Sequence, residues 1–298
     1  MEPNLSDIAL FVEVVNTRSF SRAAERLDLP ASTLSRRIAK LEAALGSRLL
    51  NRTTRRVDLT EMGAAYYTRC SPLVEEARQV HEDLAVMQDR VSGTLRLSCT
   101  PEFASLYLPD PLLAFAQQYA EVKVELDLST RRADLFSEPL DAALRIGSLQ
   151  DSTLVARRLG QVRRALFASP GYLATRSGLQ QPADLAAHEL ICMMQGPAHG
   201  QWALERRDRG AGLFTQPLES RFIAGGMGVQ RELALRGAGI AALDERLAAP
   251  DVAAGRLAPV LADWCLRPVP VYLVTASRLM PARLRLFVPL LEAHLKAG

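Results

Sequence analysis

The sequence lacks any long apolar run, and this absence excludes one large class of proteins. No stretch of about 18 apolar residues occurs, so a membrane-spanning helix is not expected. The opening residues, MEPNLSDIALF, also lack the basic segment and apolar core of a secretory signal. We therefore expect a protein of the cytoplasm.

Cysteine is scarce as well, and no enzyme motif is present. The four cysteines are Cys70, Cys99, Cys192 and Cys265. They form no CxxC pair, which leaves no recognisable zinc motif and is typical of a chain kept reduced. His188 and His199 have no cysteine or paired acids at metal-ligand spacing, and no GxSxG, HExxH or Walker pattern occurs. We therefore predict no catalytic residue, no bound metal and no cofactor.

An excess of one charge sign is confined to a short block. Residues 18–56 hold ten Lys and Arg against three Asp and Glu, whereas residues 61–298 hold 26 of each kind. A local basic block on a neutral body is typical of a module that binds a polyanion. The alternative is a charged face that contacts only water.

The basic block contains the stretch LPASTLSRRIAKLE at residues 29–42. It follows two expected helices, the first capped by Asn4 or Ser6 and the second by Ser19 or Ser21. On a helical wheel, Leu34, Ile38 and Leu41 fall on one side and the hydroxyls and cations on the other or on the flanks. A short helix, a turn and a second helix with a polar outer face indicate a helix-turn-helix, whose second helix enters the DNA major groove. Its predicted DNA contacts are Ser32, Thr33, Ser35, Arg36, Arg37 and Lys40.

A basic hairpin is expected directly after this helix. In RLLNRTTRRVDLT, residues 48–60, two short extended runs flank a pair of threonines. Arg52, Thr53, Arg55 and Arg56 surround the tip, where cations are placed to contact phosphates or the minor groove. We interpret the hairpin as the wing of a winged helix-turn-helix. An ordinary surface hairpin is the alternative.

A long helix is predicted from about residue 61. From Tyr66 to Val91 its apolar residues alternate at spacings of four and three, a heptad pattern that indicates a seam between two helices. A helix that lies on its own domain is the alternative. The residues predicted to face a partner helix are Tyr66, Leu73, Val80 and Leu84. Pro72 interrupts the pattern and is expected to kink or divide the helix.

The remainder alternates between strand-like and helical segments, which favours an α/β architecture. Thr100 and Pro101 are suited to the start of a helix. Strands are predicted at 122–129, 142–147, 164–169, 190–194, 239–243 and 271–275, and helices at 109–119, 226–237 and 281–297. The glycine-rich GGMG at 225–228 does not follow a strand into GxGxxG, so it favours a close backbone approach at a helix start over a nucleotide site.

Residues 19–63 resemble the winged helix-turn-helix of the LysR-type transcriptional regulators. Their sequence is SFSRAAERLDLPASTLSRRIAKLEAALGSRLLNRTTRRVDLTEMG. The later segments GTLRLSCTPEF, LDAALRIG, LVARRLG, SPGYL, ADLAAHELI and RGAGIAAL follow the order of that family's effector-binding domain. The resemblance implies a winged helix-turn-helix at 1–61, a linker and dimerisation helix at 62–91, and a two-lobed periplasmic-binding-protein-like domain at 92–298. Lobe I would comprise 92–163 and 268–298, and lobe II 164–267.

The resemblance also implies a function and a ligand site. The protein would regulate transcription by binding an interrupted palindrome in double-stranded DNA as a homodimer or homotetramer, with RNA polymerase as a further partner. A small-molecule inducer would lie between the lobes, against Thr100, Phe103, Ser129, Arg145, Ile146, Gly147, Met194, Gly225, Gly226 and Met227. A ligand-independent DNA-binding or assembly protein, or an α/β enzyme, is the alternative.

The inducer is predicted to be a small organic acid, aromatic rather than sugar-like. Helix starts at Thr100 and at Gly225–Gly226 would face one cleft, and helix N-termini favour anions. Phe103, Ile146 and Met227 suit an apolar body. Glu102 would repel a carboxylate unless Arg145 or a cation of the second lobe offsets it.

Overall fold

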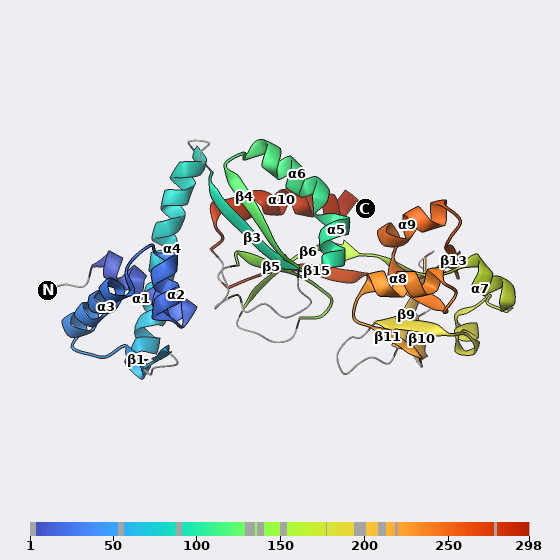
Figure 1. The fold of residues 1–298 in the computed structure, drawn as a ribbon, viewed down its shortest axis with the longest axis horizontal. Coiled ribbons are helices and arrows are strands. Elements are labelled where there is room, and N and C mark those ends of the chain that lie inside the picture. Colours follow the sequence, from blue (N-terminus) through green and yellow to red (C-terminus); the bar gives the residue numbers. More distant parts are fainter. Residues whose placement is uncertain are drawn as a thin grey trace.

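The protein comprises three parts in chain order: a small helical domain, a long helix, and two α/β lobes (Figure 1). The computed structural model describes residues 4–52, 57–87, 91–128, 135, 140–149, 154–176, 178–193, 201–207, 213–217, 220–276 and 279–297. No helix within these ranges combines the length and the apolar content that a membrane span requires.

Three helices form the N-terminal domain as predicted. They are α1 (Leu5–Thr17), α2 (Phe20–Arg26) and α3 (Ala31–Leu45). Asn4 caps α1 by accepting the backbone N–H of Asp7 at 2.8 Å, and Ser19 caps α2. Leu34, Ile38 and Leu41 of α3 are buried against the first two helices, so the predicted core face is confirmed.

A hairpin and a long helix complete this part of the chain. Strand β1 (Leu50–Arg52) pairs antiparallel with β2 (Val57–Leu59), and the turn between them lies outside the described residues. Helix α4 (Glu61–Met87) follows, and Thr60 caps its start because the Thr60 hydroxyl accepts the Gly63 N–H at 2.9 Å. A Cβ at Gly63 would lie 1.9 Å from the carbonyl oxygen of Leu49, so only glycine allows this close approach.

Helix α4 continues through Pro72, so of the two expected effects, a kink or a division, the division is wrong. A proline in a helix removes one backbone donor and so frees one carbonyl group. Pro72 is exposed, and water can therefore satisfy the carbonyl that loses its partner. The helix thus tolerates this proline at a solvent-facing position.

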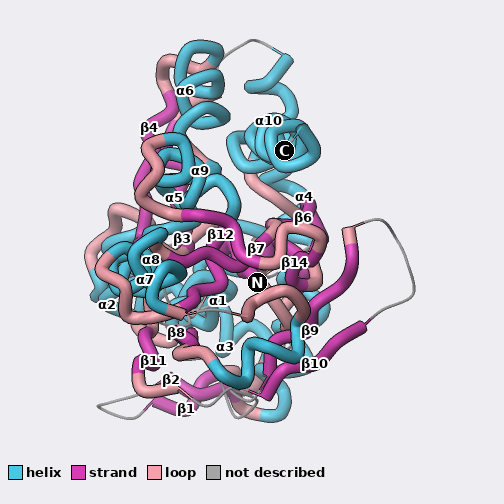
Figure 2. Tube along the Cα trace, turned by 90° about the vertical axis from the view of Figure 1, so that its right-hand side faces the viewer, coloured by secondary structure: helices cyan, strands magenta, loops and turns pink. Residues whose placement is uncertain are grey.

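Lobe I is a five-stranded sheet covered by helices. Its strands, in the order β4-β3-β5-β15-β6, are β4 (Val122–Leu128), β3 (Gly93–Cys99), β5 (Ala142–Ile146), β15 (Val269–Thr275) and β6 (Val155–Val162). Strand β3 pairs in parallel with β4 and β5, whereas β15 is antiparallel to β5 and β6. Helices α6 (Pro109–Gln118) and α10 (Ala282–Ala297) lie together on one face (Figure 2). The rings of Phe115 and Phe287 pack against each other there, with their centroids 5.5 Å apart.

Lobe II contains a second five-stranded sheet and a smaller antiparallel one. The larger, in the order β11-β8-β12-β7-β13, comprises β11 (Phe222–Ala224), β8 (Leu190–Met193), β12 (Ile240–Asp244), β7 (Arg164–Ala168) and β13 (Ala258–Val260). The smaller comprises β10 (Leu213–Pro217), β9 (Gln201–Arg206) and β14 (Trp264–Leu266). The helices are α7 (Pro170–Thr175), a 3-10 helix (Pro182–Ala187), α8 (Met227–Leu235) and α9 (Glu245–Ala253).

The chain passes between the lobes twice, from β6 into β7 and from β14 into β15, so lobe I receives its last strand and helix after lobe II is complete. Each of the six strands predicted in this region is present, with ends shifted by at most two residues. The short helix α5 (Pro101–Tyr107) starts with Thr100 as its cap, as expected, and faces lobe II.

Candidate functional site

Helix α3 presents the predicted polar face to solvent. Its N-cap position is Pro30, and no side chain caps the helix, so its hydroxyl groups are not needed for that purpose. Ser32, Arg36 and Lys40 are exposed, on the side opposite the buried leucines and isoleucine. The exposed side of α3 can therefore enter a DNA groove while its buried side stays packed in the core.

Arg37 is placed differently from the prediction. Its Nε donates to Oδ1 of Asp7 at 2.5 Å, and its Nη2 donates to the Ser6 hydroxyl at 2.8 Å. The Asp7 side chain is only 9% exposed, so this largely buried ion pair connects α3 to α1. Of the two adjacent arginines, Arg36 is therefore the one that is free to reach DNA.

The wing residues are largely beyond what the structure describes. Arg52 ends strand β1, and Thr53, Arg55 and Arg56 fall outside the described residues. Their predicted DNA contacts stay predictions.

Helix α4 has two different apolar faces. Val74 is buried against the N-terminal domain, and the Tyr66 ring packs on Phe11 with centroids 5.7 Å apart. Leu73, Val80 and Leu84 are instead exposed, each by more than half of its surface. Tyr66 thus belongs to its own domain's core, not to the predicted seam, because the first turns of α4 pack on α1. The apolar face that remains available to a partner helix starts at Leu73.

A cavity of about 150 Å³ lies between the two lobes. Lobe I contributes Thr100, Glu102, Phe103, Leu106, Tyr107, Ile146, Val162 and Val269, and lobe II contributes Arg164, Met193, Gly225, Met227 and Asp244. The structure therefore brings together five of the residues predicted to bind a ligand, namely Thr100, Phe103, Ile146, Gly225 and Met227. Within the described part of the chain, no group of three or more His, Cys, Asp or Glu is placed to hold a metal ion here or elsewhere.

Other predicted ligand residues do not line this cavity. Arg145 neighbours Ile146 on strand β5, and successive side chains of a strand point to opposite faces, so Arg145 is directed away from the cavity. Gly147 and Gly226 flank it without lining it, and Ser129 and Met194 lie outside the described residues. Arg145, one of the two cations considered as able to offset Glu102, therefore does not line the cavity.

Two oxygens of the chain itself face the helix starts at this cavity. Thr100 Oγ1 accepts the N–H of Phe103 at 3.3 Å and so caps α5. Gly226, the N-cap of α8, provides no side chain, but Glu102 of lobe I reaches it: a Cβ at Gly226 would lie 2.9 Å from Glu102 Oε1. The carboxylate of Glu102 thus lies beside the first turn of α8.

A buried hydrogen bond connects the lobes at the cavity wall. The Tyr107 hydroxyl donates to Asp244 Oδ2 at 2.5 Å, and the backbone N–H of Arg246 donates to Asp244 Oδ1 at 2.8 Å. Burial, and then the bond to Asp244, raises the pKa of Tyr107. The phenol therefore stays protonated and remains a donor.

The same wall holds a cation with an unused donor. Arg164 lies opposite Asp244 in the antiparallel pair of β7 and β12. Its Nε is shut off from solvent and has no hydrogen-bond partner. Burial lowers the pKa of Arg164, while Asp244 acts in the opposite direction. Sequence reasoning missed Tyr107, Arg164 and Asp244, because only strand and lobe pairing brings them together.

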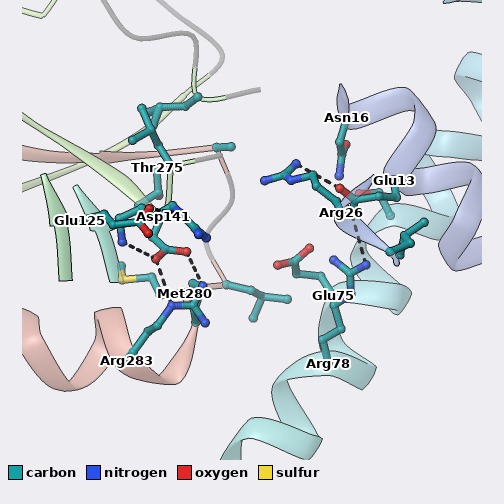
Figure 3. Close-up of a pocket in the computed structure, with 18 of the residues that line it drawn as sticks. Glu13, Asn16, Arg26, Glu75, Arg78, Glu125, Asp141, Thr275, Met280 and Arg283 are labelled. Atoms are coloured by element: carbon teal, nitrogen blue, oxygen red, sulfur yellow. Dashed lines mark hydrogen bonds and ion pairs between the residues drawn. The ribbon is translucent and has the colours of Figure 1, made fainter. Parts of the chain in front are cut away.

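A larger hollow of about 800 Å³ separates the N-terminal part from lobe I. Figure 3 shows Glu13 with Arg26 and Arg78 on one side and Asp141 with Arg283 on the other. The pairs are made within each wall: Arg26 to Glu13 at 3.0 Å, and Arg283 to Asp141 at 2.6 Å. Four arginines and four acids line this hollow, so it favours neither sign of charge in a ligand.

Both parts of the chain match known families. Residues 5–64 match "Bacterial regulatory helix-turn-helix protein, lysR family", and residues 88–296 match "LysR substrate binding domain". The regulator PtxR of Pseudomonas aeruginosa is 35% identical over 293 residues, which cover 98% of this chain and 93% of that protein. The regulator CrgA of Neisseria meningitidis is 35% identical over 264 residues, 88% of this chain and 87% of the relative.

Solved full-length regulators share the fold. The structure of CrgA, described as a LysR-type transcriptional regulator, has a TM-score of 0.60 at 33% identity and covers 99% of both chains. The Vibrio cholerae virulence activator AphB has a TM-score of 0.57 at 30% identity, covering 98% of this chain and 99% of that one. With an exposed polar face on α3 and a cavity between two lobes, the chain belongs to the LysR family of DNA-binding transcriptional regulators.

Proposed function

We propose that this regulator binds an interrupted palindromic operator as a homotetramer and that a small organic acid between the lobes controls it. The observation that carries the proposal is the inter-lobe cavity, whose walls come from two lobes linked by only two chain crossings. A ligand that contacts both walls favours one lobe arrangement over others, and such a preference shifts the population of states.

The DNA-binding part of the proposal rests on α3 and α4. The exposed Arg36 and Lys40 supply donors for base edges and phosphates. The apolar face of Leu73, Val80 and Leu84 supports pairing of two α4 helices, which would present two α3 helices to successive major-groove turns. Two such dimers make the tetramer. The protein would act in the cytoplasm, with RNA polymerase as a partner at the promoter.

The ligand part rests on size and polarity. A cavity of about 150 Å³ has the volume that accommodates a single benzene-sized ring. Phe103, Leu106 and Met227 give it apolar walls. An aromatic or short alkyl acid fits these walls better than a sugar, whose hydroxyl groups would lose their hydrogen bonds to water there.

The test is genomic footprinting of the full-length protein, followed by titration of the recovered sites. We expect two half-sites separated by about one helical turn or a multiple of it. Target genes then suggest acids, and a cognate acid should change the affinity for the operator or the length of the footprint. Footprints with no shared sequence would contradict operator recognition. A flat thermal-shift screen over organic acids and aromatic compounds would instead favour a ligand-independent DNA-binding protein.

A further inference from the structure

The helix starts at the cavity are not open to a ligand anion. Helix α5 has only seven residues, and Thr100 Oγ1 already accepts its Phe103 N–H. At the other helix start, the Glu102 carboxylate lies beside Gly226. A second carboxylate at that position would be repelled, because like charges in a poorly hydrated site interact strongly. The acid group of an effector must therefore lie elsewhere in the cavity.

Arg164 offers a position for that acid group. Its side chain lines the cavity, and its Nε has no acceptor among the described residues. A buried donor without a partner is costly, and charge-assisted hydrogen bonds are the strongest kind available to it. A carboxylate of the ligand would remove this cost, which an apolar or cationic ligand could not do.

Asp244 does not use this donor. Its Oδ2 accepts from the Tyr107 hydroxyl and its Oδ1 from the Arg246 backbone N–H. Both carboxylate oxygens of Asp244 are therefore engaged by other donors, although its charge still acts on Arg164 across the β7–β12 pair. The positive charge of Arg164 at the cavity wall is therefore only partly balanced, and its Nε–H still lacks an acceptor.

We propose that Arg164 anchors the carboxylate of the effector and that Glu102 faces the opposite end, so that the cavity selects a small monocarboxylic acid and rejects a dicarboxylic acid. A hydroxyl or amide at the far end is accepted, because such a group can donate a hydrogen bond to Glu102. This inference rests on the proposed inter-lobe effector site and names the residues that determine its specificity.

Calorimetry with a matched series of ring compounds tests the anchor. The probes are benzoate and benzamide, which differ in charge and hardly in size. We expect the wild-type full-length protein to bind benzoate about ten- to hundredfold more tightly than benzamide. The variant Arg164→Met should lose this preference, because it removes both the donor and the positive charge at the cavity wall. The control Arg236→Met, at an exposed arginine of lobe II, should keep the wild-type preference.

The role of Glu102 is tested with terephthalate and 4-carbamoylbenzoate, which have the same length and differ in their second charge. The wild type should bind the monoacid at least about tenfold more tightly. The variant Glu102→Gln should bind both compounds equally, because it removes the charge that repels the second carboxylate. This gain for a diacid cannot arise from general damage to the fold.

Three results would overturn the inference: no binding of any of the acids, equal binding of benzoate and benzamide, or a charge preference that survives in Arg164→Met. Operator titration of the same preparations separates this failure from that of the proposed function. If a neutral compound changes DNA binding while the acids do not, the effector site stands and the Arg164 anchor is wrong. If no compound changes DNA binding, the proposed control by an effector is wrong as well.

Discussion

The Tyr107 hydroxyl and the Asp244 carboxylate, 137 positions apart in the chain, form a 2.5 Å hydrogen bond that joins lobe I to lobe II. The Arg246 guanidinium lies 4.6 Å from the centre of the Tyr107 ring, and its Nη1 lies 2.8 Å from Nε2 of His294 on α10. We call these four residues the inter-lobe clasp. Since Tyr107 and Asp244 also line the cavity, a ligand there contacts the residues that fix the lobes.

The clasp predicts a loss of stability in Tyr107→Phe. The substitution leaves an oxygen of Asp244, itself 4% exposed, without its donor, which costs about 1–3 kcal/mol. Urea unfolding of the full-length protein measures this change. Tyr119→Phe is the control, because none of the described residues bonds to the Tyr119 hydroxyl. Equal stability of the two variants would mean that the clasp adds nothing.

The two neighbouring arginines of α3 should behave differently. Arg36→Ala should weaken binding to the cognate operator by about 1–3 kcal/mol and relax specificity at one base pair, with unchanged folding. Arg37→Ala should lower the free energy of unfolding by about 1–3 kcal/mol, because it leaves the buried Asp7 unpaired. Operator titrations and urea unfolding of both variants measure the difference. If Arg37→Ala changes base specificity instead, its pair with Asp7 does not persist on DNA.

The exposed apolar face of α4 predicts an assembly defect in Leu84→Asp. A charge at this position would be buried without a partner between two paired helices. Sedimentation should show smaller species that bind the operator poorly, with the circular dichroism spectrum retained. Arg69→Asp places the same charge on an exposed part of α4 outside the heptad positions and should leave assembly unchanged. An unaltered oligomer in Leu84→Asp would exclude this face from the interface.

Gly63 predicts a strong steric effect at the base of the wing. Alanine there would place its Cβ 1.9 Å from the Leu49 carbonyl oxygen and force α4 away from the hairpin, at a cost of about 3 kcal/mol. Gly171→Ala, where a Cβ meets nothing within 4 Å, is the matched control. Thermal unfolding should separate the two variants clearly. A small difference would show that the hairpin shifts readily.

His188 predicts a pH dependence of stability. Burial is the main cause that lowers its pKa, the Arg176 charge adds to this, and Asp184 opposes it. The Tyr172 hydroxyl accepts the Glu189 N–H at 2.9 Å and can donate to Nδ1 of His188, 3.2 Å away, which favours the neutral ring.

The folded state therefore binds fewer protons at His188 than the unfolded state does, and stability falls as the pH drops below about 6.5. The variant His188→Asn lacks this component, so its unfolding free energy should vary less with pH between about 7 and 5. Urea titrations at several pH values measure the difference. Parallel curves for the two proteins would contradict the lowered pKa.

Local sequence determined the parts of the fold that depend on neighbours along the chain. The caps at Asn4, Ser19 and Thr100 act within one helical turn, and the burial of Leu34 and Ile38 follows from helical periodicity. The outward polar face of α3, the α/β alternation and the LysR-type resemblance all follow from such short-range patterns. For that reason they could be predicted without a structure.

Only the tertiary structure decided which side chains share a partner. The pair of Arg37 with Asp7 spans 30 positions, and the heptad from Tyr66 onward could not show that its first members pack on α1. The cavity wall of Arg164 and Asp244 arises where β7 meets β12 and is completed by Tyr107 from the other lobe. Polar pairs of this kind leave no periodic signal in the sequence, because the distance between partners depends on chain crossings and not on helical or strand repeat.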